Sequence, residues 1–192
     1  MQIVLASSNK NKVKEINAIV SSFNIEFILP PEDFDPIEDG KTFEENSMIK
    51  ANAAWNLSKS WTLADDSGLC IDALDGAPGI HSARYAQTPQ GRIDRVLSEM
   101  QGIENRSARF KCCMTLLNPK GELAFSCTET CEGNITYSQR GSNGFGYDPI
   151  FNIKNSTKTM AELSEEEKND ISHRGKALRK VLEFIKGLEN ED

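Results

Sequence analysis

The sequence has no hydrophobic run that approaches the ~18 consecutive apolar residues of a membrane-spanning helix. It also lacks the basic start and apolar core of a signal peptide, because a strand-like apolar segment begins at its second residue. Basic residues are in the minority, with 22 lysines and arginines against 29 acidic residues, and the net charge of −7 argues against a protein that coats nucleic acid. We therefore expect a cytoplasmic protein that binds neither membranes nor nucleic acids. Small anionic ligands remain possible, since a local group of lysines and arginines matters more to them than the overall charge.

Cysteine is scarce and is not arranged for bridges or metals. The count of five is odd, two cysteines are adjacent, and none form a C-x-x-C pair, so the sequence indicates neither a disulfide framework nor a structural zinc site. Reduced thiols fit the cytosol best. With 192 residues and 38% hydrophobic content, the chain is long enough for one core or for two lobes that share a cleft, and we expect a single domain over residues 1–192.

Hydrophobic periodicity predicts a mixture of strands and helices. Apolar residues at helical spacing alternate along the chain with short apolar runs and with period-two segments, two of which form a long hairpin. This mixture favours an α/β or α+β fold whose sheet is extended by an antiparallel hairpin. The predicted strands are 2–6, 27–29, 108–116 and 123–127, and the predicted helices are 13–20, 42–58, 92–100, 164–168 and 172–185.

Two adjacent acids, Asp65 and Asp66, stand where a buried strand would be expected. Apolar residues precede them at 61–64 and follow them at 69–71, so the carboxylates interrupt an otherwise buried strand. Buried carboxylates persist when they are paired, hydrogen-bonded or bound to a cation, and two in sequence can hold a hard divalent ion such as Mg2+. The alternative is a strand-terminating turn, for which the Ser-Gly that follows is also suited.

A small polar loop joins the first predicted strand to the first predicted helix. It places hydroxyls, backbone N–H groups and Lys12 at a helix N-terminus, where the helix dipole favours phosphate. The loop is not a Walker motif, because it lacks the glycines and the Gly-Lys-Ser/Thr ending. A serine or asparagine that merely caps the helix is the competing explanation. The loop comprises Ser7, Ser8, Asn9, Lys10, Asn11 and Lys12.

Three glycines surround two aromatic residues and an acid in the segment 140–151. Because Gly144 and Gly146 flank Phe145, the backbone there can approach a ligand closely, and the flat ring is suited to stack on a base. A β-bulge or an ordinary loop would have a similar composition.

His173 and Arg174 follow Ser172, which has the character of an N-cap for the last helix. Cations in the first turn oppose the helix dipole, so this placement requires an anionic or polar partner. A lone histidine is more often a structural hydrogen-bonder, but the pair at an unfavourable position favours ligand binding.

Five segments in this order resemble the inosine/xanthosine triphosphate pyrophosphatase family, from residue 2 to about residue 185. The resemblance implies a mixed α/β (α+β) fold of two lobes around an elongated, strongly twisted mixed sheet, with the nucleotide in a central cleft and usually a homodimer. It also implies Mg2+-dependent hydrolysis of ITP, dITP and XTP to the monophosphate and pyrophosphate, which keeps deaminated purines out of DNA and RNA. The segments are the loop 7–12 with Glu15, Ala64-Asp65-Asp66-Ser67-Gly68-Leu69, Gly76-Ala77-Pro78-Gly79, Gly144-Phe145-Gly146-Tyr147-Asp148-Pro149-Ile150-Phe151 and Ser172-His173-Arg174.

The resemblance also implies roles for individual residues. Asp66 is the expected metal-binding acid and general base, Glu38 is the expected second metal ligand, and Glu45 is the less favoured choice for that place. Lys12 is the principal cation of the loop 7–12, which cradles the triphosphate, although Ser8 stands where the family commonly has glycine. The other implied substrate contacts are Ser7, Ser8, Asn9, Lys10, Asn11, Lys50, Ser67, Phe145, Gly146, Tyr147, Asp148, Lys168, His173 and Arg174, of which the residues from Phe145 onward form the nucleoside-binding group.

The implied reaction is chemically coherent with these residue types. Cleavage between the α and β phosphates requires charge neutralisation on the leaving pyrophosphate, which lysines and Mg2+ supply, and an oriented water at the α-phosphorus. Hypoxanthine and xanthine present a 6-oxo acceptor and an N1–H donor, whereas adenine presents the reverse, so donation to O6 by Arg174 or a backbone amide could discriminate by roughly 10^4. The sequence does not show which group reads position 2, where guanine differs from hypoxanthine.

The sequence is also compatible with two other functions. A pyrophosphatase of related fold could act on modified pyrimidine nucleotides instead. A non-catalytic nucleotide sensor could keep the binding residues without turnover, although the retention of Asp66 and Lys12 disfavours this reading.

Overall fold

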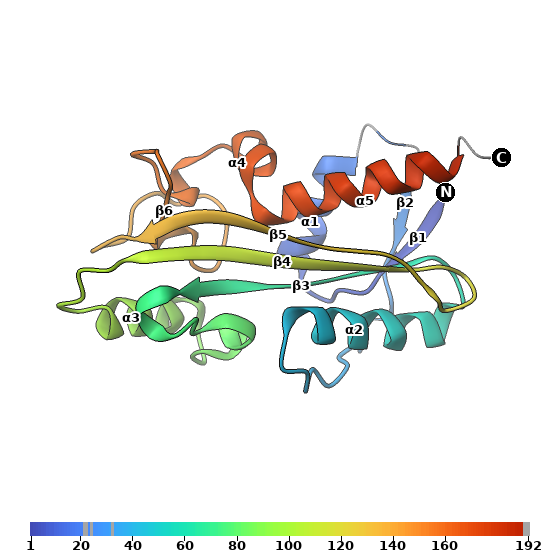
Figure 1. Cartoon of the computed structure of the whole chain (residues 1–192), viewed down its shortest axis with the longest axis horizontal. Helices are drawn as coiled ribbons and strands as arrows, with labels where there is room; N and C mark the ends of the chain where they lie inside the picture. Colours follow the sequence, from blue (N-terminus) through green and yellow to red (C-terminus); the bar gives the residue numbers. More distant parts are fainter. Residues whose placement is uncertain (21–22, 24, 32, 190–192) are drawn as a thin grey trace. The chain divides into compact units, whose positions relative to one another are not determined.

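The computed structural model (Figure 1) describes residues 1–20, 23, 25–31 and 33–189. Strands and α-helices alternate up to residue 117, and two further strands and two α-helices follow. No helix within these residues is long and apolar enough to cross a lipid bilayer. The α-helices are α1 (Lys10–Val20), α2 (Phe43–Ser58), α3 (Pro89–Glu99), α4 (Glu165–Ile171) and α5 (His173–Glu189), and short 3-10 turns cover Asp72–Leu74, Gly79–Arg84, Asp148–Ile150 and Met160–Glu162.

The strands form a mixed sheet in the order β2-β1-β3-β4-β5-β6. Strand β1, next to the edge strand β2, pairs in parallel with both of its neighbours, β2 and β3, whereas β5 pairs antiparallel with β6. The sheet therefore confirms the expected mixed α/β architecture. The bounds are β1 (Gln2–Leu5), β2 (Glu26–Ile28), β3 (Thr62–Ile71), β4 (Ser107–Leu117), β5 (Leu123–Ile135) and β6 (Phe151–Ile153).

Internal contacts divide the chain into two compact units. Both are assembled from separated stretches, and β3, β4 and β5 contribute residues to each, so neither unit is a continuous segment of the sequence. Unit 1 comprises Met1–Asp66, Cys112–Glu129 and Arg174–Asp192, and unit 2 comprises Ser67–Lys111 and Thr130–His173.

In unit 1 the sheet is covered by helices on both faces (Figure 1). Successive residues of β1 point to opposite faces, so Ile3 and Leu5 pack with α1 and α5, while Val4 and Ala6, the residue after the strand, pack with α2. Burial on both faces explains why β1 reads as a continuous apolar run and not as an alternating one. The apolar stripe of α5, from Ala177 to Ile185, is buried as its spacing predicts.

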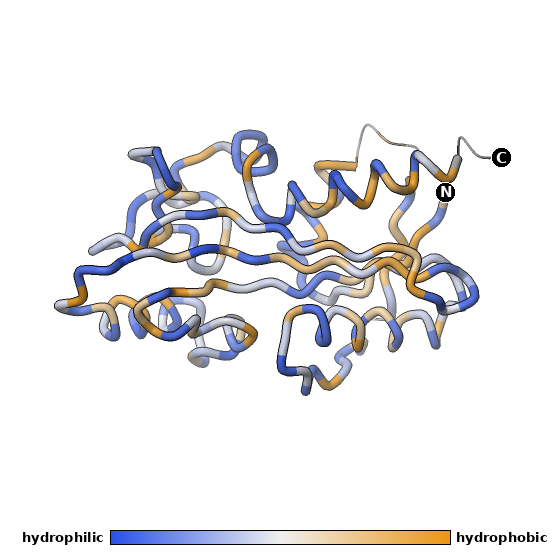
Figure 2. The backbone as a smooth tube through the Cα atoms, viewed as in Figure 1, coloured by the Kyte–Doolittle hydropathy of each residue, from blue (hydrophilic) through white to orange (hydrophobic). Residues whose placement is uncertain are grey.

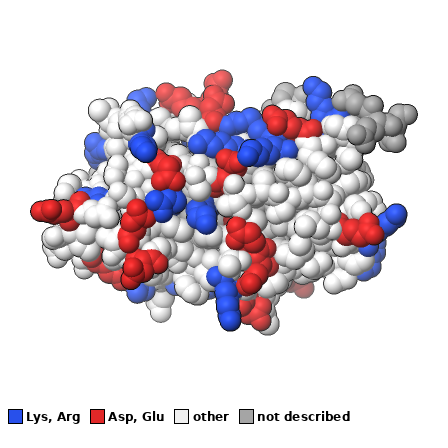
Figure 3. Space-filling view, in the orientation of Figure 1, with Lys and Arg blue, Asp and Glu red and all other residues white. Residues whose placement is uncertain are grey.

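Unit 2 has a hydrophobic core of its own. Ile93 and Val96 of α3 pack with Phe110 of β4 and with Phe151 of β6, and the rings of the two phenylalanines lie 4.5 Å apart between centroids. Figure 2 shows hydrophobic stretches on the strands and an alternation of hydrophobic and hydrophilic residues along α5. Acidic and basic side chains are interspersed on the face seen in Figure 3, as the composition suggests.

Local capping explains where two of the helices begin. The Thr42 hydroxyl accepts a hydrogen bond from the backbone N–H of Glu45 at 3.1 Å and starts α2. Ser164 and Glu167 satisfy each other's backbone N–H groups in the predicted capping box of α4. The return strand β5 is longer than predicted, because its later residues continue into pairing with β6.

The predicted interruption at Asp65 and Asp66 is wrong. β3 continues through both residues and through the Ser-Gly that follows as one strand of ten residues. A turn is unnecessary because alternation sends the two carboxylates to opposite faces, where each meets its own cations.

Candidate active site

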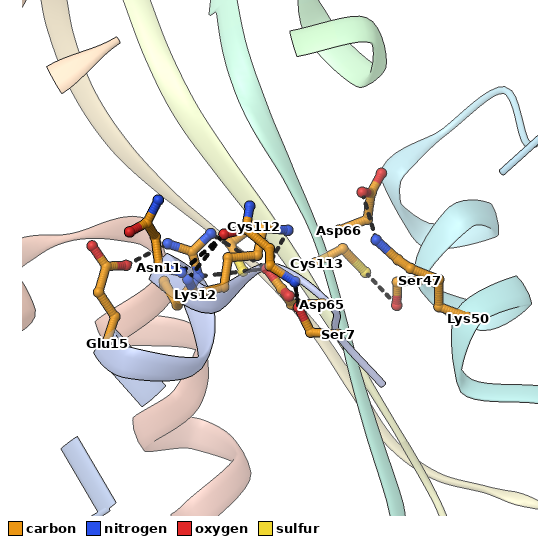
Figure 4. A network of polar contacts seen from close by, with 12 residues as sticks. Ser7, Asn11, Lys12, Glu15, Ser47, Lys50, Asp65, Asp66, Cys112 and Cys113 are labelled. Carbon is orange, nitrogen blue, oxygen red and sulfur yellow. Dashed lines mark hydrogen bonds and ion pairs between the residues drawn. The ribbon is translucent and has the colours of Figure 1, made fainter. Parts of the chain in front are cut away.

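The two carboxylates of β3 separate the polar residues of unit 1 into two groups, which Figure 4 shows on either side of the strand. Asp65 meets Lys12 from α1, and Asp66 meets Lys50 from α2. Both acids are buried, with 1% of Asp65 and 6% of Asp66 exposed, so each requires compensation. The cations arrive from helices that pack on the corresponding face of the sheet.

Asp66 belongs to a cluster with one lysine and a second acid. The Lys50 ammonium lies 2.9 Å from Oδ1 of Asp66 and 3.5 Å from Oε1 of Glu38. Burial raises the pKa of Asp66, and the nearby Glu38 charge raises it further, against the attraction of Lys50 and Lys12. Although burial lowers the pKa of Lys50, its carboxylate neighbours raise it overall. Lys50 therefore stays protonated, and the neighbouring Asp66 carboxylate accepts a proton more readily than an aspartate in water does.

Glu38 and Glu45, the two candidates for the second metal ligand, lie in different surroundings. Glu38 shares Lys50 with Asp66. Glu45 is exposed, and its Oε2 accepts a hydrogen bond from the backbone N–H of Lys41 at 2.6 Å. The geometry therefore favours Glu38, which the sequence ranked first.

Asp65 is the acceptor for a group of cations on the opposite face. Its Oδ2 lies 2.9 Å from Nζ of Lys12 and 3.4 Å from both Nε and a terminal nitrogen of Arg174. Burial raises the pKa of Asp65, but the charges of Lys12, Arg174 and Lys50 outweigh it and hold that pKa well below the ordinary range. The neighbouring Cys112 thiol is buried beside this carboxylate, and desolvation raises its pKa. Asp65 is therefore ionised at neutral pH, and the Cys112 thiol stays protonated there.

Two carboxylates of unit 1 surround the guanidinium of Arg174. Its terminal nitrogen Nη1 lies 2.5 Å from Oε2 of Glu15, its remaining nitrogens face Asp65, and only 3% of its side chain is exposed. The anionic partner that a cation at this helix start requires is thus supplied by two carboxylates of the protein itself. Burial lowers the pKa of Arg174, but Asp65 and Glu15 raise it overall.

The loop 7–12 combines capping with an open pocket. The Asn9 side chain accepts hydrogen bonds from the backbone N–H groups of Asn11 and Lys12 at 3.0 and 3.4 Å, so the capping explanation holds for this residue. Ser8 and Lys10 are exposed at the start of α1. A pocket of about 540 Å³ opens beside the loop, and its lining is Ser7, Ser8, Lys10, Val13, Lys14, Leu29, Pro30 and Pro31.

Unit 2 brings together several of the implied nucleoside contacts. Lys168 of α4 lies 2.5 Å from Oδ2 of Asp148, which also accepts the backbone N–H of Phe145 at 2.8 Å. The Lys168 ammonium lies 4.8 Å from the centre of the Phe145 ring. Gly144 closes the turn at φ +72°, and a Cβ there would stand 2.0 Å from Oδ2 of Asp148. These residues form one tightly fitted cluster, called here the Asp148 cluster.

Two other implied contacts are held in the core of unit 2. Tyr147 is buried, and its hydroxyl donates to the carbonyl of Ser82 at 2.9 Å. Desolvation raises the pKa of this hydroxyl. The His173 ring stacks on Phe110 with centroids 4.9 Å apart and an interplanar angle of 13°. Ser67 is half-buried in β3, next to Asp66, and Gly146 adopts φ +63° beside the Asp148 cluster.

The family resemblance implied no individual role for Asp65 or Glu15, although both belong to the charge network around Lys12 and Arg174. Lys12 and Glu15 are three residues apart on α1 and so share a helix face, which is a signal that could have been used. The partnership of Asp65 with Arg174 has no local signal, because 109 residues separate them.

A divalent cation fits the Asp66 cluster. No three histidine, cysteine, aspartate or glutamate side chains gather as a metal site within the described part of the chain. Mg2+ does not need such a cage, since it binds one or two carboxylates and completes its shell with waters and phosphate oxygens. Oδ2 of Asp66 is buried without a hydrogen-bond partner among the described residues, and Glu38 supplies a second carboxylate nearby. The all-oxygen donor set therefore fits a hard divalent cation.

Comparison with known proteins decides the family. The Ham1 family model matches residues 3–184, nearly the whole chain. The chain belongs to the Ham1 family. Among curated relatives, a dITP/XTP pyrophosphatase of Treponema denticola is 51% identical, with 97% of this chain and 100% of the relative covered. A dITP/XTP pyrophosphatase of Bacillus anthracis is 45% identical, with 96% of each chain covered.

Solved structures of the Ham1 family agree with the fold. A HAM1 protein from Coxiella burnetii aligns with a TM-score of 0.88 and 41% identity, covering 97% of this chain and 99% of that one. The Ham1 protein of Staphylococcus aureus aligns with a TM-score of 0.87 and 39% identity over the same shares. The resemblance seen in the sequence motifs is thereby confirmed at the level of family and fold.

Proposed function

We propose that this chain is a nucleoside triphosphate pyrophosphatase that hydrolyses dITP, XTP and ITP to the monophosphate and pyrophosphate. The observation that carries the proposal is the Asp66 cluster, in which a carboxylate with an unpaired buried oxygen adjoins Lys50 and Glu38. Membership of the Ham1 family and relatives that carry the name dITP/XTP pyrophosphatase support this assignment. The role of such an enzyme is to remove deaminated purine nucleotides before they enter DNA or RNA.

Lys12 and Lys50 are the residues proposed to bind the phosphate chain. Lys12 stands at the first turn of α1, where the helix dipole adds positive potential, and 14% of its side chain is exposed. Lys50 keeps its charge because of its acidic neighbours. Hydrogen bonds from these ammonium groups to phosphate oxygens would neutralise the charge that develops on the leaving pyrophosphate.

Asp66 and Glu38 are the proposed ligands of Mg2+, which when bound would neutralise phosphate charge and draw electron density from the phosphorus. Oδ1 of Asp66 stays with Lys50, and Oδ2 is the oxygen available to the metal or to water. Because both proposed ligands are carboxylates, the site suits Mg2+ better than it suits cobalt or zinc, and it does not resemble a structural metal site.

The chemical step is an in-line displacement at the α-phosphorus. The oxygen of a water molecule forms a bond to this phosphorus, the bond to the α–β bridging oxygen breaks, and the electron pair leaves with pyrophosphate. Asp66 orients the water and accepts its proton, a task that the raised pKa of this carboxylate assists. Lys12 and Lys50 stabilise the departing charge.

The Asp148 cluster is the proposed contact for the nucleoside. Phe145 offers an aromatic ring for stacking on the base. Lys168 offers donors and Asp148 offers acceptors, and these are the two kinds of partner that the 6-oxo and N1–H groups of hypoxanthine and xanthine require. Adenine presents the inverse pattern and would leave buried polar groups unpaired.

A product assay over a nucleotide panel tests this function. With Mg2+, the purified protein is expected to convert dITP, ITP and XTP to monophosphate plus pyrophosphate much faster than ATP, GTP, dTTP or UTP. Equal rates across the panel, or release of orthophosphate in place of pyrophosphate, would contradict the assignment. We propose in addition that the protein works in the cytoplasm and that it forms a homodimer. Light scattering of the purified protein would test the homodimer.

A further inference from the structure

The carboxylate of Glu38 reaches the Asp66 cluster from a stretch without regular structure. Residues 33–42, which lead from β2 into α2, contain neither a helix nor a strand, and 24% of the Glu38 side chain is exposed. This carboxylate nevertheless lies 3.5 Å from the Lys50 ammonium. Since no ladder of backbone hydrogen bonds fixes the stretch, contacts with side chains must hold it in place.

Contacts with α2 fix this stretch on both sides of Glu38. Four residues earlier, Phe34 is buried in the hydrophobic cluster that α2 forms with β1. Two residues later, the backbone N–H of Gly40 donates a hydrogen bond to Oδ1 of Asn46 at 2.9 Å. The backbone that carries Glu38 is therefore held against α2 before and after this residue.

Asn46 is buried and fits closely around Gly40. None of its surface is exposed, and a Cβ at Gly40 would stand 2.6 Å from Oδ1 of Asn46 and 2.8 Å from Cβ of Glu45. The other end of the amide, Nδ2 of Asn46, is buried with no hydrogen-bond partner in the described part of the chain. Because an unpaired buried donor opposes folding, stability alone does not explain an asparagine at this position.

Asn46 and Lys50 are four residues apart on α2, so they lie on the same face of the helix, and both are buried. This face contacts the Glu38 region twice. Asn46 holds the backbone that follows Glu38, and Lys50 faces its carboxylate. Glu45 also accepts a hydrogen bond from this stretch, from the backbone N–H of Lys41, but that bond is exposed and water can replace it.

We propose that Asn46 is a positioning residue, which holds the stretch 38–41 so that Glu38 can bind the divalent cation together with Asp66. The inference rests on the proposed function and extends it to a residue behind the proposed metal ligands. A ligand that is already held in place loses less conformational freedom when it binds the cation. Groups that hold metal ligands from behind commonly change metal affinity by roughly 10- to 100-fold.

The decisive test is a double-mutant cycle between Asn46 and Glu38, read by the binding of Mn2+ in electron paramagnetic resonance titrations. The protein is saturated with an ITP analogue whose α–β bridge is a methylene group, so that no turnover occurs. Asn46→Ala is expected to weaken Mn2+ binding roughly tenfold, and by no more than Glu38→Gln does. In the Glu38→Gln background, Asn46→Ala should add less than about twofold, because the carboxylate that it positions is gone.

A matched control is Asn118→Ala, in the turn between β4 and β5 of unit 1. Oδ1 of Asn118 also accepts backbone N–H groups, from Lys120 at 2.9 Å and from Glu122 at 3.1 Å. This control is expected to leave Mn2+ binding unchanged. Equal losses from Asn46→Ala in the wild-type and Glu38→Gln backgrounds would overturn the proposal, because they would show a general structural effect. A wild type that binds no Mn2+ would overturn it too.

Gly40→Ala covers the case in which Asn46→Ala does not fold. Its added Cβ would press on the Asn46 amide from the other side of the same hydrogen bond, so Mn2+ binding should weaken in the same direction, again only when Glu38 is present. Hydrogen exchange at the backbone N–H of residue 40 should be faster in both variants. Faster exchange with unchanged Mn2+ affinity would refute the proposal. Because Mn2+ binding needs no turnover, a protein that shows the expected cycle but does not hydrolyse ITP would contradict the proposed function alone.

Discussion

Lys50 lies 2.9 Å from Oδ1 of Asp66 and leaves Oδ2 of the same carboxylate buried, with no hydrogen-bond partner among the described residues. A buried acceptor left unpaired is unfavourable by about 1–3 kcal/mol, so the arrangement stores free energy at the place where a metal ion or a water would relieve it. In a purely structural ion pair, both carboxylate oxygens would have partners. The unpaired Oδ2 of Asp66 instead indicates a site that binds a ligand.

Replacing Asp66 with Asn should abolish most turnover while the protein stays folded. Loss of a general base slows a reaction by roughly 10^2- to 10^4-fold, and loss of a metal ligand adds to this. Steady-state hydrolysis of ITP by the variant, with circular dichroism to confirm the fold, provides the measurement. Activity retained within about tenfold of the wild type would remove Asp66 from its catalytic role.

The same variant should be as stable as the wild type or more stable at neutral pH. Burial raises the pKa of Asp66 in the folded protein, so the ionised carboxylate opposes folding above that pKa, and the wild type gains stability as pH falls toward the unfolded value of about 3.9. Denaturant unfolding of both proteins at pH 7 and near pH 4 measures this. A variant much less stable at pH 7 would show that the Lys50 pair outweighs desolvation.

Asp65 should behave in the opposite way. Its carboxyl has a lowered pKa in the folded state, because Lys12 and Arg174 outweigh burial, so it contributes stability above the unfolded pKa of about 3.9 and loses that contribution as pH falls below it. The difference in unfolding free energy between wild type and Asp65→Asn should be constant from about pH 7 to 5 and shrink below about pH 4. A difference that does not change with pH would mean that charge is not the source of the stabilisation.

The sequence predicted those features of the fold that depend on neighbouring residues only. Thr42 begins α2, Ser164 and Glu167 cap α4, and the apolar stripe of α5 is buried, because capping and periodicity depend only on near neighbours. The preference for Glu38 over Glu45 as metal ligand stays a prediction, which the contact of Glu38 with Lys50 supports.

Pairing between distant stretches of the chain could not be predicted from the sequence. Two charges in a strand suggested an interruption at Asp65, yet β3 continues because cations from α1, α2 and α5 arrive on both faces. Arg174 was expected to contact the ligand, and no local pattern reveals that Glu15 and Asp65 enclose it. Tyr147 lies in a motif of binding residues but is used by the core of unit 2. Such partnerships join distant stretches and become visible only in the folded chain.

Gly144 and Gly146 offer a matched pair of substitutions on either side of Phe145. Both have positive φ, +72° and +63°, so alanine at either site introduces about 1–2 kcal/mol of backbone strain. Only at Gly144 would the new Cβ meet a neighbour, Oδ2 of Asp148 at 2.0 Å, whereas nothing lies within 4 Å at Gly146. Gly144→Ala should therefore lose about 1–3 kcal/mol more stability than Gly146→Ala and should raise the KM for ITP. Unfolding and kinetic measurements on both variants would test this, and equal effects would show that the Asp148 contact is unimportant.

Glu38 and Glu45 provide the corresponding test of the metal site. Glu38 shares Lys50 with Asp66, so Glu38→Gln should raise the Mg2+ concentration for half-maximal activity by at least roughly tenfold. Glu45 is bonded to the backbone of Lys41 at the start of α2, so Glu45→Gln should leave the Mg2+ dependence unchanged and lower the melting temperature slightly. Activity titrated with Mg2+ for both variants separates the two effects. If Glu45→Gln shifted the Mg2+ requirement while Glu38→Gln did not, the second ligand would have to be reassigned, and the Lys50 contact of Glu38 would be a purely structural ion pair.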